Sequence, residues 1–518
     1  MKIMINRVTM AVLALLLVMG ACKKAADVQP VASLSRSTPE AEGVSSEDIM
    51  RFLDSAAVSP HEFHSIMIVR HGKVVAEGWW APYRSDLRHT LYSTSKSFTS
   101  TAVGFAVTEK LITVTDKVVS FFPEDLPDTI SPYLANLTVK DLLTMSVGQD
   151  PDPTFTVRSA DSNWVKSFLA LPIINEPGTK FLYNSMATYM LSAIVQKVTG
   201  EKVIDYLKPR LFQPLAIEGM DWEEDPRGIN TGGWGLRVRT EDMAKFGQLY
   251  LQKGKWNGKQ ILPAAWVEEA TSFKIDQSPD SIPPEMEQNE WNHGYCYQFW
   301  RCRNNAYRAD GAFGQYIFVM PDKDAVIAIT SESPDMGSEM ELVWKFLYPA
   351  LRDEKLPENP EMAGRLKERL ANLVLPVPDK GVAPQLAQEI SGKIFTMEDN
   401  AFLATSLQFT FAGDSCILNT KSAGTEIVNV FGAGRWIKGE TLMPGPNLLG
   451  SAKDMPPAKV VGAYGWEGDT LQLALRFIES PHTQYLPCAF SKDKVLVSII
   501  PSNNPNMNIP PLKGVIKK

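Results

Sequence analysis

Residues 92–98 read Tyr-Ser-Thr-Ser-Lys-Ser-Phe, so that Ser93 and Lys96 are separated by two residues. Apolar residues at helical spacing follow directly, from Phe98 onward, and a helix is expected to begin here. Side chains three positions apart share one face of a helix, so Lys96 can hydrogen-bond to the Ser93 hydroxyl. The positive end of the helix favours an alkoxide, and the pattern therefore predicts a serine nucleophile activated without histidine.

A second Ser-x-x-Lys pattern, at residues 491–494, falls in an expected β-hairpin and is read as chance. The context favours Ser93, because Phe-Leu-Tyr-Asn-Ser at residues 181–185 comes just before an amphipathic helix that ends at Gly200. A neighbouring ammonium stabilises a phenolate, so we expect the pKa of the Tyr183 phenol to fall and Tyr183 to act as the base. A core tyrosine packed beside a helix N-cap is the alternative interpretation.

The third element is Arg-Ala-Asp-Gly-Ala-Phe-Gly-Gln-Tyr at residues 308–316, where glycines open a strand that continues to Met320. Glycine allows a substrate to approach the backbone, and an edge strand beside a cleft can offer an amide N–H. Together with the N–H of Ser93, such a group would form an oxyanion hole. A glycine-containing bend in a strand is the alternative.

In this order and spacing, the three elements resemble those of the serine β-lactamase and penicillin-binding-protein superfamily, nearest to its class C-like branch of esterases and oligomer amidases. The resemblance covers roughly residues 37–350. It implies an α+β fold, in which an antiparallel sheet is flanked by helices and joined to a helical lobe. The residues that match the family's motifs are Ser93, Lys96, Tyr183 and Gly311, and Ala312 would donate the second oxyanion N–H.

Two departures from the family's pattern concern substrate binding. Asparagine stands beside Tyr183 rather than two positions after it, so either Asn184 or Ser185 would support the substrate and the lysine. Residues 309–310 are Ala-Asp where the family has lysine and threonine, so the cation that holds a substrate carboxylate is missing unless Arg308 supplies it. This departure weakens the expectation of β-lactam or D-Ala-D-Ala cleavage.

The N-terminus predicts export. Basic residues precede an apolar run at residues 10–19, which is too short for a membrane span, and residues 1–21 are interpreted as a signal peptide. Met-Gly-Ala-Cys at residues 19–22 resembles a bacterial lipobox, which implies cleavage before Cys22, acylation of its thiol and anchoring in the bacterial envelope. An ordinary secretory signal with an incidental cysteine is the alternative. Residues 22–38 would form the tether.

Composition shifts predict three further segments. Residues 39–352 would form the hydrolase domain, and the charged, proline-rich residues 353–384, with a helix at 361–373, would link it to the next domain. Residues 385–518 contain short β-rich runs divided by Gly, Asp and Asn, which predict a small antiparallel sheet or barrel. This domain resembles the lipocalin-like appendages of some such hydrolases. It would cover the cleft, bind a ligand of its own, or brace the hydrolase domain.

Several classes of function are disfavoured. The net charge of −7, with lysine and arginine scattered along the chain, offers no basic stripe for nucleic acid. The six histidines form no metal-binding pattern, His61 and His64 are read as solvated loop residues, and no metal or cofactor is expected. Buried thiols are slightly favoured over disulfides for Cys296, Cys302, Cys416 and Cys488.

The sequence therefore predicts hydrolysis of an ester or amide, such as a D-amino-acid peptide or a β-lactam, through an acyl-enzyme on Ser93. Tyr183 would also activate the water that releases the acyl group. The alternative is a non-catalytic receptor that binds a peptide or a cell-wall fragment in the same cleft.

Overall fold

The computed structural model describes residues 33–277, 289–448 and 455–516 of the chain. The predicted signal peptide, residues 1–21, and the predicted lipidation site at Cys22 lie outside these residues, so both stay predictions. Within the described part of the chain, no helix is both long and apolar enough to cross a membrane.

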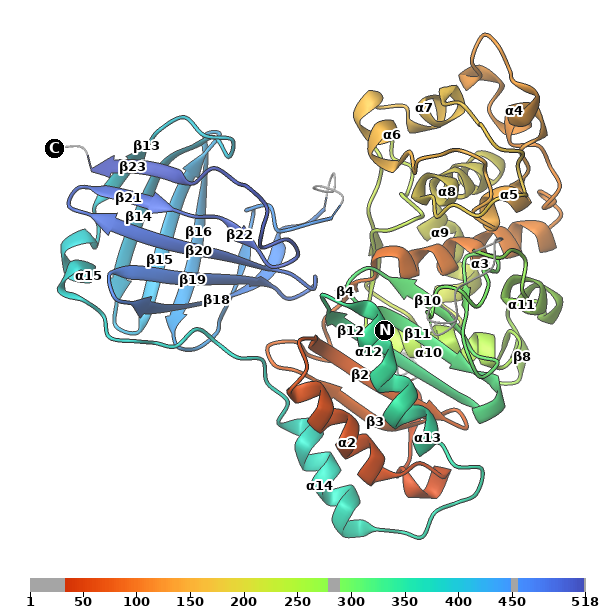
Figure 1. Cartoon of the computed structure of the whole chain (residues 1–518), viewed down its shortest axis with the longest axis horizontal. Helices are drawn as coiled ribbons and strands as arrows, with labels where there is room; N and C mark the ends of the chain where they lie inside the picture. The colour runs from red at the N-terminus through yellow and green to blue at the C-terminus, as the bar shows by residue number, and fades with distance from the viewer. Residues whose placement is uncertain (1–32, 278–288, 449–454, 517–518) are drawn as a thin grey trace, which may run out of the picture. The chain divides into compact units, whose positions relative to one another are not determined.

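A seven-stranded sheet lies at the centre of the first folded domain (Figure 1). Its neighbouring strands pair antiparallel, except β1 and β3, which are parallel. In spatial order the strands are β1 (Ser35–Arg36), β3 (Lys73–Trp79), β2 (Glu62–Arg70), β12 (Ala325–Glu332), β11 (Gln315–Met320), β10 (Tyr307–Gly311) and β9 (Trp300–Arg301).

Residues 65–78 contain two runs rich in β-branched residues around His71 and Gly72, a pattern that predicts an antiparallel hairpin, and β2 and β3 form it. His71 and Gly72 connect the strands with φ of 50° and 73°, the left-handed pair that a two-residue hairpin turn requires. The start of the domain differs from the prediction, because Ser35 and Arg36 pair with β3 and Leu34 is buried. The predicted tether, residues 22–38, therefore extends too far, since its last residues belong to the seven-stranded sheet.

Helices cover both faces of the sheet, because alternate residues of each strand point to opposite sides. On β12, Val326 and Ala328 join one buried cluster, whereas Ile327 and Ile329 join the other. Gly247 brings its helix close to the first face, because a Cβ there would lie 2.6 Å from Val326 Cγ1. That helix is α10 (Thr240–Leu251), and the opposite face carries α2 (Ser46–Ala57), α12 (Met336–Leu342), α13 (Tyr348–Ala350) and α14 (Pro360–Ala371).

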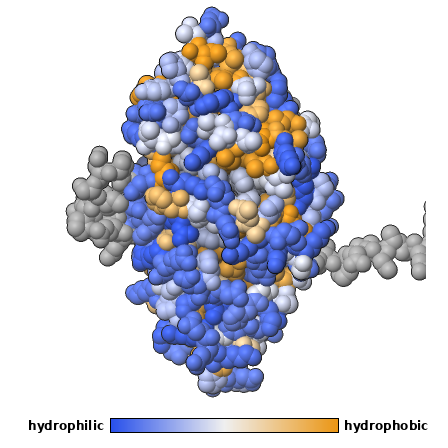
Figure 2. Space-filling view, turned by 90° about the vertical axis from the view of Figure 1, so that its right-hand side faces the viewer, coloured by the Kyte–Doolittle hydropathy of each residue, from blue (hydrophilic) through white to orange (hydrophobic). Residues whose placement is uncertain are grey.

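A helical lobe occupies most of the chain between β4 and β5 (Figure 1). Its helix α8 ends at Gly200, whose φ of 73° gives the left-handed cap that the sequence predicts. The face in Figure 2 is mainly hydrophilic, with hydrophobic residues in small groups. The helices are α3 (Ser95–Thr108), α4 (Pro132–Asn136), α5 (Val139–Leu143), α6 (Thr154–Ala160), α7 (Trp164–Ala170), α8 (Ser185–Thr199) and α9 (Val203–Leu207).

Shorter elements complete the domain. A three-stranded sheet joins β4 (His89–Thr90), β6 (Leu236–Val238) and β5 (Asp221–Trp222), and a small hairpin precedes a further helix. These last elements are β7 (Lys255–Trp256), β8 (Lys259–Gln260) and α11 (Ala264–Thr271).

Helix α14 lies in the segment that the sequence assigns to a linker, residues 353–384, close to the predicted bounds 361–373. It packs against β3, where a Cβ at Gly78 would lie 2.7 Å from Leu373 Cδ1 and 2.9 Å from Leu370 Cδ2. Leu366 and Leu370 are buried in the core beneath the sheet. This part of the predicted linker is therefore a structural element of the first folded domain.

The C-terminal residues form a nine-stranded β-barrel, because β16 pairs with both β15 and β18 and so closes the ring. Its strands pair antiparallel apart from that closing pair, as the sequence predicts for a small barrel. In ring order the strands are β16 (Thr425–Ala433), β15 (Ser415–Ser422), β14 (Ala404–Ala412), β13 (Ile394–Met397), β23 (Leu512–Ile516), β21 (Lys494–Val497), β20 (Thr483–Ser491), β19 (Thr470–Phe477) and β18 (Ala458–Glu467).

Three smaller elements border the ring: β17 (Ile437–Thr441) on β18, β22 (Ile500–Pro501) on β20, and α15 (Gln385–Ile390). Ser491 and Lys494 face each other at the β20–β21 turn, so the second Ser-x-x-Lys copy does lie in a hairpin. The four cysteines of the described residues are free and buried, which confirms the preference for buried thiols.

Replacing Leu366 by Ala should destabilise the first folded domain by about 2–5 kcal/mol, because truncation of this buried leucine of α14 leaves a cavity. Val374→Ala is the matched control, since Val374 is 65% exposed and its loss should change stability by at most about 0.5 kcal/mol. Urea unfolding followed by tryptophan fluorescence measures both. Equal midpoints for the two variants would show that α14 is only a tether.

Candidate active site

Ser93 lies in a tight 3-10 turn, Tyr92–Thr94, directly before helix α3. Tyr92 precedes it with a φ of 47°, a strained conformation that the surrounding contacts must hold. The hydroxyl of Thr94 donates to the carbonyl of Gln315 at 2.6 Å, which ties this turn to strand β11. The Ser93 side chain is therefore presented from a turn that is fixed on both sides.

Lys96 lies one helical turn after Ser93, as the sequence predicts, and only 2% of it is exposed. Its Nζ donates to Ser93 Oγ at 3.0 Å, to Ser185 Oγ at 3.1 Å and to the carbonyl of Gly233 at 2.7 Å. Burial removes water from the ammonium and lowers the pKa of Lys96 to about 7, although nearby carboxylates oppose the change. The amine is therefore poised to gain or lose a proton near neutral pH.

Tyr183 lies beside the same pair, and Lys96 Nζ is 4.9 Å from the centre of its ring. The ring stacks on Trp300 at 5.6 Å between centroids. Burial raises the pKa of Tyr183, and a hydrogen bond with Ser93 only partly offsets that effect. The predicted fall in this pKa is thus wrong in direction, because desolvation of the phenolate exceeds the effect of the neighbouring groups.

The sequence predicts that Lys96 and Tyr183 share the Ser93 proton with Tyr183 as the base, and these two shifts move the role of the base to Lys96. An amine whose pKa is about 7 can accept the Ser93 proton at neutral pH. A phenol with a raised pKa keeps its proton and acts as a hydrogen-bond donor toward the Ser93 oxygen. The directions of the two pKa shifts therefore favour Lys96 as the base and Tyr183 as the donor.

Asn184 and Ser185 take different places at the start of α8. The Asn184 side chain accepts from the N–H groups of Met186 and Ala187 as the helix N-cap, and donates to Gln149 Oε1 at 3.0 Å. Asn184 is 1% exposed, whereas Ser185 Oγ accepts from Lys96. Of the two alternatives, the structure thus places Ser185 against the lysine and uses Asn184 to hold the helix.

Gly311 and Ala312 lie at the turn between β10 and β11, next to the Tyr92–Thr94 turn that carries Ser93. A Cβ at Gly311 would lie 2.2 Å from the carbonyl oxygen of Leu91 and 3.0 Å from Thr94 Oγ1, so only glycine fits. The strand therefore passes directly against the segment that carries Ser93. Ala312, the next residue, begins the turn from which its N–H would serve as the second oxyanion donor.

Arg308 does not reach the site as a free cation. It is fully buried, and its Nε donates to Asp310 Oδ2 at 2.9 Å while its Nη1 donates to the carbonyl of Glu290 at 3.0 Å. Its guanidinium lies near the rings of Trp291 and Trp300. The suggestion that Arg308 holds a substrate carboxylate is therefore wrong, because its charge is already paired with Asp310.

Gln298 is a structural partner of the site that residue patterns did not identify, whereas Gly233 belongs to the segment Gly-Gly-Trp-Gly-Leu at residues 232–236, which supports the family resemblance. The side chain of Gln298 donates to the carbonyls of Leu142 and Leu143, and it accepts from Thr188 Oγ1 at 2.6 Å. It thereby connects α5 with α8. Gly233 lies in a glycine-rich run, which was the available signal, but its contact with Lys96 depends on the fold.

A hydrogen-bonded chain from the barrel ends beside the nucleophile. Tyr92 Oη lies 2.6 Å from His482 Nε2, and His482 Nδ1 lies 2.6 Å from Glu332 Oε1. His482 is fully buried between β19 and β20 of the barrel, whereas Glu332 ends strand β12 of the hydrolase sheet. The strained Tyr92 is thus held by a residue of the C-terminal domain.

Ion pairs flank this chain. Arg476 of the barrel donates from Nη2 to Glu62 Oε2 at 3.0 Å, and Glu479 accepts from Arg88 Nε at 3.2 Å. Glu62 also contacts His64, which is fully buried, and His61 is only 6% exposed. Both histidines therefore differ from the predicted solvated loop.

Comparisons with known proteins agree with this architecture. The family model described as Beta-lactamase matches residues 64–348, more than half of the chain. Over 337 residues the chain is 26% identical to the 6-aminohexanoate-dimer hydrolase of Paenarthrobacter ureafaciens, covering 60% of this chain and 84% of that protein. It is 19% identical over 321 residues to a beta-lactamase of Escherichia coli K12, covering 51% and 81%.

A solved structure titled "Putative 6-aminohexanoate-dimer hydrolase from Bacillus anthracis" has the same fold, with a TM-score of 0.52 and 21% identity. The match covers 63% of this chain and 89% of that chain.

The reactivity of Ser93 should rise with pH through a midpoint near 7. Below that pH the Lys96 side chain is an ammonium and has no lone pair with which to accept the Ser93 proton. Above that pH it is a neutral amine, which has such a lone pair. The measurement is the rate of adduct formation with a fluorophosphonate between pH 5 and 9, with Lys96→Met as the control that should react slowly at every pH. A flat profile, or a midpoint near 10, would contradict this assignment.

Gly311→Ala should lower the same rate by about 100-fold, because the added Cβ displaces the turn from Leu91 and misplaces the oxyanion donor. Gly364→Ala in α14 is the matched control, since nothing lies within 4 Å of the added Cβ. It should react as the unmodified protein does. Full reactivity in Gly311→Ala would exclude a close fit at this turn.

Proposed function

The chain belongs to the Beta-lactamase family, and from this premise we propose that it is a serine hydrolase that cleaves an ester or amide through an acyl-enzyme on Ser93. One observation carries the proposal: the Lys96 amine, with a pKa of about 7, lies 3.0 Å from Ser93 Oγ. A buried serine–lysine contact with a neutral base is the arrangement that makes a hydroxyl nucleophilic.

The reaction follows from the groups around Ser93. Its Oγ attacks the carbonyl carbon as its proton passes to Lys96, and the N–H groups of Ser93 and Ala312 hold the oxyanion. Lys96 and Tyr183 return the proton to the departing alcohol or amine. Water then loses a proton to the free amine of Lys96 and attacks the acyl carbon, and the alkoxide of Ser93 recovers the proton as it leaves.

The charges near Ser93 bear on the class of substrate. Arg308 is neutralised by Asp310, so it offers no cation for a substrate carboxylate. The carboxylates of Asp152 and Asp310 both lie near enough to Lys96 to raise its pKa. We therefore propose that linear amides and esters with no carboxylate next to the scissile bond are better substrates than β-lactams and D-Ala-D-Ala peptides. The relative from Paenarthrobacter ureafaciens, whose name gives an aminohexanoate dimer as its substrate, supports the amide class.

Two further parts of the proposal concern the whole chain. The barrel braces the nucleophile turn, because its His482 contacts Tyr92, the residue before Ser93. Residues 1–22 support export of the protein and a lipid anchor at Cys22 in the bacterial envelope.

A fluorophosphonate tests the proposal against the alternative of a non-catalytic receptor. Intact mass and peptide mapping should locate one adduct on Ser93, and Ser93→Ala should lose both the adduct and the hydrolysis of a panel of short-chain esters and linear amides. Ser491→Ala is the matched control, because it removes the other Ser-x-x-Lys serine and should keep both activities. The unfolding midpoint of Ser93→Ala should be nearly unchanged.

A protein that is folded yet forms no adduct and hydrolyses nothing would be a receptor, and an adduct on another serine would contradict the assignment of Ser93.

A further inference from the structure

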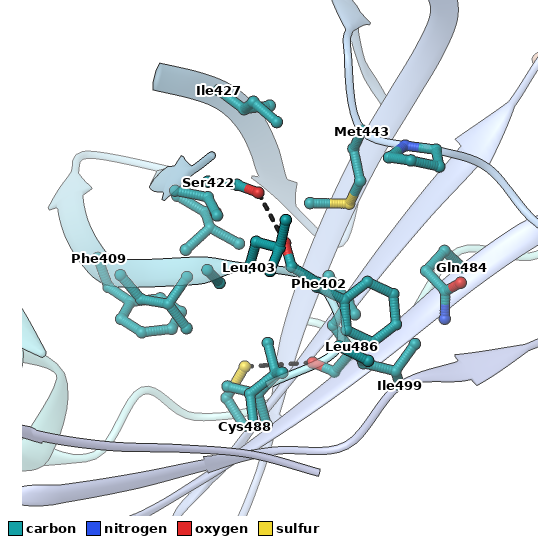
Figure 3. Close-up of a pocket in the computed structure, with 18 residues that line it drawn as sticks. Phe402, Leu403, Phe409, Ser422, Ile427, Met443, Gln484, Leu486, Cys488 and Ile499 are labelled. Carbon is teal, nitrogen blue, oxygen red and sulfur yellow. Dashed lines mark hydrogen bonds between the residues drawn. The ribbon is translucent and has the colours of Figure 1, made fainter. Parts of the chain in front are cut away.

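The C-terminal barrel contains a cavity of about 270 Å³. Its wall is mainly apolar, with Thr420, Ser422 and Gln484 as the polar side chains that line it. Figure 3 shows Phe409, Leu486 and Ile499 around it. No acidic, basic or histidine side chain belongs to the described residues that line it. A charged group would lose its hydration here without a partner, so the cavity suits an uncharged molecule.

On the neighbouring strands β15 and β16, two buried polar side chains have atoms with no hydrogen-bond partner among the described residues. Thr420 lines the cavity, is 6% exposed and has an unpaired Oγ1. Asn429 is 2% exposed, and both its Oδ1 and its Nδ2 are unpaired. Buried polar groups in folded proteins are normally hydrogen-bonded, so these three atoms need a partner that the described residues do not supply.

Strand register places the two side chains on the same wall. Thr420 of β15 pairs with Ile427 of β16, and Leu418 pairs with Asn429. Leu418, Thr420 and Ile427 all line the cavity, and residues two apart on a strand share a face. Asn429 therefore faces the barrel interior on the same face as Thr420 and Ile427, next to the residues that line the cavity.

One end of the cavity is bordered by the loop that carries Phe402 and Leu403, which are 42% and 64% exposed (Figure 3). Ser422 Oγ donates to the carbonyl of Phe402 at 2.7 Å, and Asn400 Nδ2 donates to the carbonyl of Ala404 at 2.8 Å. The loop is thus held in place, with apolar side chains at the rim. An apolar ligand would meet these side chains first.

The volume limits the size of the ligand. A cavity of about 150 Å³ holds a benzene molecule, with its six carbons, so about 270 Å³ corresponds to roughly eleven non-hydrogen atoms. We propose that the barrel binds a medium-chain aliphatic molecule with one uncharged polar group, such as an alcohol, and that Thr420 and Asn429 hydrogen-bond to this group. The site is separate from Ser93 and goes beyond the proposed hydrolase function.

Calorimetric titration of the full chain with decan-1-ol tests the site. We expect binding, and at least about tenfold weaker binding of decanoate and of decyltrimethylammonium, because each would bury a charge. Decane should also bind about tenfold more weakly, since it leaves Thr420 and Asn429 without a partner. Equal affinity for decane would overturn the polar contact, and tighter binding of either ion would overturn the choice of an uncharged ligand.

Variants locate the ligand. Thr420→Val and Asn429→Leu should each weaken decan-1-ol binding about tenfold, whereas Thr405→Val, on an exposed threonine of β14, should not change it. Leu418→Trp should abolish binding by filling the cavity. Circular dichroism and the thermal midpoint establish that each variant is folded.

Undiminished binding to folded Leu418→Trp would place the ligand elsewhere and overturn the proposal. Fluorophosphonate labelling of Leu418→Trp should be unchanged, so failure at this cavity and failure of the hydrolase assignment give different results.

Discussion

Burial of one amine is the constraint on which the rest of the site depends. Lys96 is almost without exposure, and water that would stabilise its charge is replaced by oxygens of Ser93, Ser185 and Gly233. Those oxygens come from separate parts of the domain, so the helices and the glycine-rich run must pack together before the amine is desolvated. Packing of the core thereby sets the protonation of the group that lies against the nucleophile.

The raised pKa of Tyr183 comes from the same desolvation. A phenol that keeps its proton and an amine that has lost its own are complementary near neutral pH, because one donates and the other accepts. The barrel contributes to this arrangement, since His482 holds Tyr92 in its strained conformation. The packing of the first domain, the burial of Lys96 and Tyr183, and the contact from the barrel therefore together set the position of Ser93 and the protonation of its two neighbours.

Local patterns predicted the elements whose cause is local. The spacing of Ser93 and Lys96, the His71–Gly72 hairpin turn and the Gly200 helix cap each depend on a few neighbouring residues. Long-range contacts escaped prediction. Arg308 pairs with Asp310, only two residues away, because both are buried, and burial also sets the direction of the Tyr183 pKa. That burial comes from residues distant in sequence, which periodicity does not reveal.

The boundaries of the predicted segments failed for a similar reason. Leu34 and helix α14 look like tether and linker by composition, but the sheet offers each an apolar surface on which to pack. Titration of the Lys96 amine itself tests the account most directly. In the full chain with ¹³C at the lysine ε-carbons, NMR should show one resonance that titrates near pH 7 and is missing from Lys96→Met. Titration of every lysine above pH 9 would contradict it.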